Sequence, residues 1–90
     1  MGESLDKRRK RLKFRAWHRG TKEMDLLIGS FADLHLAQMT AAELDLFEPL
    51  LDLPEPVLYG WLTGRAAPDP DYDHHVMKLL LDFKFAPTKS

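Results

Sequence analysis

The sequence predicts an all-α protein, a compact five-helix bundle that forms a single domain over residues 1–90. Apolar residues recur at spacings of three and four in five segments, which is the period of amphipathic helices. No segment alternates apolar and polar residues for long enough to predict a strand. Capping residues, glycines and prolines separate the five segments. The core is expected to span about residues 5–84, and residues 85–90 are predicted to be a loose tail.

The first predicted helix covers residues 4–17. Ser4 is a suitable N-cap, because its hydroxyl can accept a hydrogen bond from the first turn. The residues that share the apolar face of this helix are Leu5, Leu12 and Ala16, and Phe14 and Trp17, three residues apart, are expected to extend it. Residues 18–21 interrupt the pattern, since Gly20 readily takes the left-handed conformation that ends a helix.

The second predicted helix begins after Thr21, a second capping residue, and runs over residues 22–36. It has the clearest amphipathic pattern in the chain. Its apolar positions are Met24, Leu27, Ile28, Phe31 and Leu34. Gly29 lies inside this helix, where it costs about 1 kcal/mol relative to alanine. We therefore expect a bulky side chain, such as an aromatic ring, to pack closely against it.

A third helix is predicted from the capping box formed by Thr40 and Glu43. Its apolar residues are Leu44, Phe47 and Leu51. Pro49 falls inside this pattern, so the helix is expected to kink or to end early near Glu48.

Two further helices complete the predicted bundle. The fourth has Pro54 in its first turn and is ended by Gly64, and a loop over residues 65–71 follows. The fifth is predicted over residues 71–83. The predicted core residues are Trp17, Phe31, Leu44, Phe47, Leu58, Trp61 and Leu80.

The charge of the chain is unevenly distributed. Residues 1–22 contain nine bases and two acids, a net charge of +7, whereas residues 23–90 have a net charge of −8. Seven of the bases fall within residues 7–15. Four interpretations remain open: nucleic-acid binding, a membrane-surface helix, docking on an acidic protein, or packing against the acidic helices of the same chain.

Few residues suit catalysis or metal binding. The sequence has no cysteine, which excludes disulfides, thiolate metal sites and cysteine nucleophiles. None of the serines lies in a GxSxG elbow, and His18, His35, His74 and His75 lack the spacing of a metal-binding pair. We therefore expect no enzyme activity and no metal ion. Neither a secretory signal nor a membrane-spanning stretch is visible, so we expect a cytoplasmic location.

Residues 18–25 place opposite charges around a glycine between two predicted helices. Arg19 offers a planar fork of donors and Glu23 an acceptor, while Gly20 lets a partner's backbone come close. The alternative is an ordinary interhelical turn in which Arg19 and Glu23 pair with each other. In both cases we expect Arg19, Gly20 and Glu23 to be largely exposed.

Residues 19–23 match the pattern RGxxE. On this motif, and on residues 24–31, 43–48, 51–56 and 58–64, the chain resembles the SdhE family of succinate dehydrogenase assembly factors, for which RGxxE is characteristic. The resemblance therefore covers roughly residues 8–83 in one consistent order. Members of the family are small five-helix proteins that promote covalent attachment of FAD to the flavoprotein subunit.

The resemblance implies a protein that acts by binding. The implied partner is the flavoprotein subunit of succinate dehydrogenase or fumarate reductase, which itself holds the FAD, so no cofactor is stably bound here. Binding would keep the partner's histidine and the flavin close together. The implied partner-binding residues are Arg19, Gly20 and Glu23, together with His18, Thr21, Lys22 and Asp25. We expect a monomer that neither inserts into a membrane nor binds nucleic acid; the alternatives are a generic protein–protein adaptor or nucleic-acid binding through the basic first helix.

Overall fold

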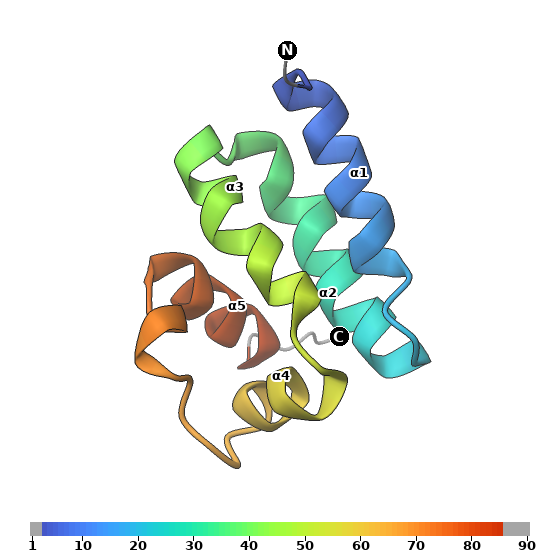
Figure 1. Cartoon of the computed structure of the whole chain (residues 1–90). Coiled ribbons are helices and arrows are strands. Elements are labelled where there is room, and N and C mark those ends of the chain that lie inside the picture. The colour runs from blue at the N-terminus through green and yellow to red at the C-terminus, as the bar shows by residue number, and fades with distance from the viewer. Residues whose placement is uncertain (1–2, 86–90) are drawn as a thin grey trace.

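The computed structural model describes residues 3–85, which form five α-helices and three short 3-10 segments with no strand among them (Figure 1). The helices are α1 (Leu5–Trp17), α2 (Lys22–His35), α3 (Ala41–Phe47), α4 (Glu55–Leu62) and α5 (His75–Phe85). The 3-10 segments are η1 (Leu36–Gln38), η2 (Glu48–Asp52) and η3 (Pro70–Tyr72). The predicted all-α class with five helices is confirmed. Of the predicted tail, residue 85 ends α5 and residues 86–90 lie outside the described residues.

Side-chain caps fix the starts of the first three helices. Ser4 and Thr21 each accept a hydrogen bond from the backbone N–H three residues later, at 3.1 and 3.2 Å. Thr40 and Glu43 form the predicted capping box, in which each side chain accepts from the other residue's backbone N–H. These bonds satisfy donors that have no partner within a helix, so the three helices begin where their caps predict.

The third helix ends where Pro49 requires it to end. The α-helix stops at Phe47, and the chain continues as η2 with Pro49 in its first turn. A proline ring clashes with the carbonyl four residues earlier and offers no N–H, so regular α-helical hydrogen bonding cannot continue. The early end near Glu48 is therefore confirmed.

The fifth helix begins four residues later than predicted. Pro70 starts the short segment η3, and Asp73 then has a non-helical backbone with φ −91° and ψ 75°. The helix starts at His75, because the Nδ1 atom of His74 accepts a hydrogen bond from the backbone N–H of Met77 at 3.1 Å. Burial lowers the pKa of His74, which favours the neutral ring that this bond requires.

The buried apolar residues form a single core between the helices. Phe31 of α2 lies within it, with its ring stacked on that of Phe47 at 5.7 Å and edge-on to Phe83 at 5.8 Å. Six predicted core residues are buried: Phe31, Leu44, Phe47, Leu58, Trp61 and Leu80. Trp17 is only partly buried, so the prediction that it belongs to the buried core is wrong. Its ring lies at the edge of the α1–α2 interface, and its Nε1 atom donates to Asp33 at 3.2 Å.

Trp17 explains the glycine inside α2. A Cβ atom added at Gly29 would lie 2.2 Å from Cδ2 of the Trp17 ring, which is far inside van der Waals contact. The helices α1 and α2 lie side by side along most of their length (Figure 1). The predicted aromatic contact at Gly29 is confirmed, and it sets how closely these two helices approach.

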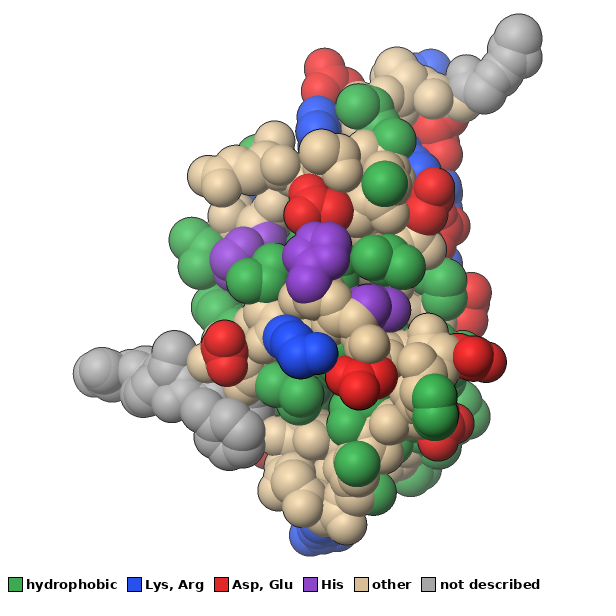
Figure 2. All heavy atoms as spheres, turned by 90° about the vertical axis from the view of Figure 1, so that its left-hand side faces the viewer, with side chains coloured by type: hydrophobic (Ala, Val, Ile, Leu, Met, Phe, Trp, Pro, Cys, Tyr) green, Lys and Arg blue, Asp and Glu red, His purple; other side chains and the backbone are tan. Residues whose placement is uncertain are grey.

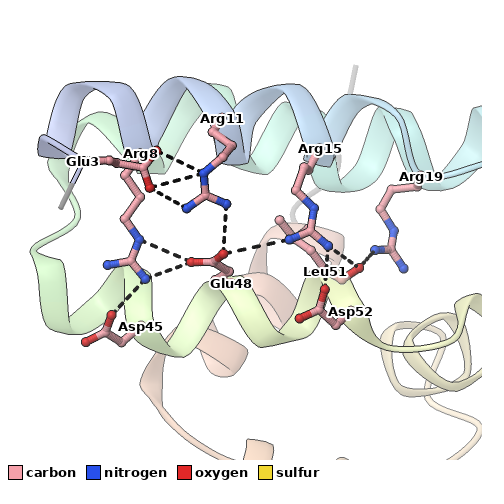
Figure 3. A network of polar contacts seen from close by, with 9 residues as sticks. All are labelled: Glu3, Arg8, Arg11, Arg15, Arg19, Asp45, Glu48, Leu51 and Asp52. Carbon is pink, nitrogen blue, oxygen red and sulfur yellow. Dashed lines mark hydrogen bonds and ion pairs between the residues drawn. The ribbon is translucent and has the colours of Figure 1, made fainter. Parts of the chain in front are cut away.

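Three arginines of α1 face a row of acids across the bundle, and we call this set of residues the charge seam (Figure 3). It consists of Arg8, Arg11 and Arg15 on α1 with Asp45, Glu48 and Asp52 on α3 and η2. The nitrogen–oxygen distances are 2.8 Å for Arg8–Asp45, 2.9 Å for Arg11–Glu48 and 2.6 Å for Arg15–Asp52. Much of the positive charge of α1 is thus used within the chain, which favours the interpretation of packing against its own acidic helices.

Histidine side chains gather on the side of the molecule where α3 and α5 lie in Figure 1, and Figure 2 shows this side. The Nε2 atom of His75 lies 2.8 Å from Oε2 of Glu43 and joins these two helices. Within residues 3–85, no three His, Asp or Glu side chains are arranged to hold a metal ion. In the same range, no helix has both the length and the apolar character needed to cross a bilayer.

We expect Gly29→Ala to lower the free energy of unfolding by about 1–3 kcal/mol, because the added methyl group displaces Trp17 or the backbone of α2. Gly60 in α4 is the matched control, since no described atom lies within 4 Å of the place its Cβ would take. Gly60→Ala should raise the free energy of unfolding by about 0.5–1 kcal/mol. Chemical denaturation measures both changes, and equal stability of the two variants would contradict the packing.

We expect the charge seam to weaken in acid. The hydrogen bond from Arg11, reinforced by Arg8, holds the pKa of Glu48 below its ordinary value of 4.5. Because this pKa is lower in the folded protein, the stabilisation is complete above about pH 4.5 and is lost as the pH falls through the folded pKa.

Denaturation curves measured between neutral pH and pH 3 test this expectation. Glu48→Gln should reduce stability at pH 7 and flatten its dependence on pH below about pH 5. Asp69→Asn changes an exposed loop carboxylate with no ion pair to a described residue and is the control. Parallel pH profiles for Glu48→Gln and the parent protein would contradict this role of Glu48.

Candidate functional site

The turn between α1 and α2 lies against the junction of η2 and α4. Residues 18–21 form this turn, and their contacts reach residues more than thirty positions later in the chain. The predicted RGxxE segment therefore joins two parts of the fold, and its side chains divide into an inner and an outer group.

Arg19 belongs to the inner group. Its side chain is only 6% exposed, and its guanidinium donates hydrogen bonds to the carbonyl oxygens of Leu51 and Leu53, the latter at 3.1 Å. The same group lies 3.8 Å from a carboxylate oxygen of Glu55. The expectation that Arg19 is largely exposed is therefore wrong, because the main chain around η2 offers carbonyls that no helix satisfies. The alternative of a local pair with Glu23 is also wrong, since Arg19 faces Glu55 instead.

Asp25 and Thr21 hold the backbone of the turn. One carboxylate oxygen of Asp25 accepts from the backbone N–H groups of Arg19 and Gly20, at 2.5 and 3.3 Å. The hydroxyl of Thr21 caps α2 and also donates to Glu55 at 2.7 Å. Gly20 has φ +135°, a backbone conformation that residues other than glycine rarely adopt. The turn is thus fixed by both its backbone and the neighbouring helix.

The outer group consists of His18, Gly20, Lys22 and Glu23, all of them exposed. No described atom lies within 4 Å of the place where a Cβ of Gly20 would lie, so the backbone there is open to a partner. Glu23 accepts a hydrogen bond from the hydroxyl of Tyr59 at 3.1 Å, and this bond raises the pKa of Tyr59.

A cavity of about 290 Å³ lies between the start of α2 and α4. Its walls are formed by Thr21, Glu23, Met24, Glu55, Pro56 and Tyr59. The cavity opens beside the outer group, so a partner that contacts Glu23 also reaches the exposed apolar surface of Pro56.

Sequence reasoning missed the residues of α4 that complete this site. Glu55 and Tyr59 lie four positions apart, a spacing that places both on one side of a helix and that was available from the sequence. Leu51 and Leu53 contribute main-chain carbonyl oxygens, which every residue has. No side-chain pattern could have pointed to them.

The whole of this site lies within a region of the chain that is similar to known proteins. A family described as the flavinator of succinate dehydrogenase matches residues 10–84, a range that includes the turn and both segments against which it packs. The chain belongs to this family. The resemblance of the sequence to SdhE assembly factors is thereby confirmed.

Several curated relatives of this flavinator family match the chain. The FAD assembly factor SdhE of Acetobacter pasteurianus is 52% identical over 63 residues, covering 70% of this chain and 58% of the relative. The mitochondrial succinate dehydrogenase assembly factor 2 of Dictyostelium discoideum is 34% identical over 76 residues, covering 84% and 54%. Its Candida glabrata counterpart is 38% identical over 87 residues, covering 92% and 57%. The chain thus spans a little over half the length of these relatives.

We expect Arg19→Ala to lower the free energy of unfolding by about 1–3 kcal/mol, because two carbonyl oxygens lose a charged donor. Arg19→Lys should recover only part of this loss, since an ammonium group lacks the planar fork that reaches both carbonyls. Arg65→Ala removes an exposed arginine and should change stability by less than about 0.5 kcal/mol. Chemical denaturation of the three variants checks these values, and an Arg19→Ala protein as stable as Arg65→Ala would contradict the inner role of Arg19.

Proposed function

We propose that this protein is an assembly factor that binds the flavoprotein subunit of succinate dehydrogenase, or of fumarate reductase, and promotes covalent attachment of FAD to a histidine of that subunit. The observation that carries the proposal is the flavinator family match over residues 10–84. The names of the relatives agree with it, since one includes FAD assembly and others include succinate dehydrogenase assembly.

We assign the contact with the flavoprotein to the outer group of the turn. His18, Gly20, Lys22 and Glu23 face solvent, and Gly20 leaves room for a partner's backbone. Arg19 acts as a positioning residue, because it holds the turn against η2 and α4 from the inside. A turn held in this way loses little conformational entropy on binding, which favours affinity.

The protein acts in this proposal by binding and not by turnover. The flavin and the partner's histidine supply the chemistry of attachment, while this chain keeps the flavoprotein in a conformation that brings the two groups together. The cavity beside Glu23, about 290 Å³, is at the lower limit for a drug-sized ligand, and the carboxylates of Glu23 and Glu55 in its wall disfavour the pyrophosphate of a dinucleotide. This supports the view that FAD stays with the flavoprotein and that no cofactor is stably bound here.

The charge seam argues against nucleic-acid binding through α1. Arg8, Arg11 and Arg15 already pair with carboxylates of the same chain, so phosphate contacts would have to displace those pairs. A generic adaptor has no observation of its own in its favour. We therefore retain one function. We further propose that a monomer carries it out in the cytoplasm.

We expect Glu23→Gln to reduce covalent flavinylation while leaving the fold intact. Glu23 is exposed, so its replacement should change stability by no more than about 0.5 kcal/mol. If its carboxylate anchors the flavoprotein, the loss of its charge should weaken binding by about tenfold or more. The measurement is in-gel fluorescence of covalent flavin on the flavoprotein subunit, in cells that lack their own factor and receive each variant.

Asp82→Asn is the matched control, because it neutralises an exposed carboxylate on α5, away from the turn. Flavinylation should be normal in cells that carry it. Full flavinylation with a folded Glu23→Gln protein would remove Glu23 from the contact surface. A lack of any response to the parent protein would overturn the proposed function itself.

A further inference from the structure

Phe14 is the most exposed large apolar side chain of the described residues. It is 64% exposed on the outer side of α1, where helices of small proteins normally carry polar groups. The imidazole of His18 stacks on its ring with the centroids 4.0 Å apart. The core gains little from Phe14, yet His18 connects this ring directly to the turn at Gly20.

Other apolar side chains continue this surface onto α2. Trp17 lies one helical turn after Phe14 on α1, and its ring packs on Gly29 of α2. Leu26 lies one turn before Gly29 on the same side of α2 and is 52% exposed. By this spacing Phe14 and Trp17 of α1 and Leu26 of α2 lie on the sides of the two helices that flank the Trp17–Gly29 contact, and we call these three residues the α1–α2 patch.

Lysines surround the α1–α2 patch in a regular manner. Lys10, Lys13 and Lys22 each precede one of its members by four residues, the spacing that brings side chains together on a helix. Lys13 forms an ion pair with Asp33, with Nζ 3.4 Å from Oδ1. Lys10 and Lys22 form no ion pair with any residue in the range 3–85. Three of the four arginines of α1 are paired in the charge seam, but Lys10 and Lys22 keep the rim of the patch positive.

We propose that the α1–α2 patch is a second contact with the flavoprotein subunit, where it meets an apolar surface bordered by acidic side chains. This inference rests on the proposed function. An aromatic centre with a charged rim is the usual anatomy of a protein interface, and aromatic residues supply a large share of binding energy there. Because His18 belongs both to the turn and to the stacked pair, a flavoprotein that covers the turn also covers Phe14.

The same surface suits a protein better than a nucleic acid or a membrane. Two unpaired lysines provide few phosphate contacts, and residues 23–90 have a net charge of −8. A helix that lies in a membrane surface needs a continuous apolar face, but Leu12 and Ala16 of α1 are buried in the core. The aromatic ring and the positive rim together fit an acidic, partly apolar protein surface.

Binding of the purified protein to the flavoprotein subunit tests the patch. Phe14→Ala should raise the dissociation constant by about tenfold or more. Leu34→Ala removes a side chain of similar exposure, 58%, near the far end of α2, and it should change the constant by less than about twofold. Trp17 is not a suitable target, since its removal also disturbs the packing on Gly29. Melting curves of both variants should match that of the parent protein, because neither side chain is buried.

Charge reversal tests the rim. Lys10→Glu should weaken binding and reduce its dependence on salt, whereas Lys78→Glu, at a 67% exposed side chain on α5, should do neither. Parent-like affinity of both Phe14→Ala and Lys10→Glu would overturn the patch while leaving the proposed function in place. Absence of binding by the parent protein would overturn both. Retention of the parent protein on duplex DNA or on phosphatidylglycerol vesicles near physiological salt, abolished by Lys10→Glu, would assign the patch to that ligand instead.

Discussion

The fold depends on which donors form hydrogen bonds with the main-chain carbonyl oxygens between Pro49 and Pro54. Pro49 and Pro54 prevent a continuous helix from α3 to α4, so carbonyl oxygens around η2 face the protein interior without helical partners. The guanidinium of Arg19 donates to two of them, at Leu51 and Leu53. These bonds attach the α1–α2 turn to the start of α4. They thereby hold the turn, together with its outer group, beside α4.

Local signals in the sequence were sufficient for most of the fold. Ser4, Thr21 and Thr40 mark helix starts, Pro49 marks a helix end, and Gly29 marks a close contact, because each acts through chemistry within a few residues or through its own size. The start of α5 was misplaced for a related reason. Polar residues near Pro70 look like a helix start, but the chain makes a 3-10 turn before His74 caps the helix.

Long-range electrostatics could be predicted only in part. Residues 8, 11 and 15 and residues 45, 48 and 52 have the same spacing of three and then four, so two rows of opposite charge are visible in the sequence. Their pairing depends on the antiparallel or parallel arrangement of helices, which no local signal determines. The burial of Arg19 was hidden more completely, because its acceptors are backbone atoms. The outer and inner groups of the turn were therefore predicted as one exposed set.

The two attachments of α1 also differ in kind, so acid affects them differently. The charge seam holds α1 through carboxylates, and acid neutralises carboxylates. The guanidinium of Arg19 holds the turn after α1 largely through main-chain carbonyl oxygens, which acid does not neutralise. As the pH falls, the charge seam therefore weakens while the anchor of the turn keeps its partners. Each arginine that loses its carboxylate partner then adds to the positive charge of residues 7–15, which contain seven bases.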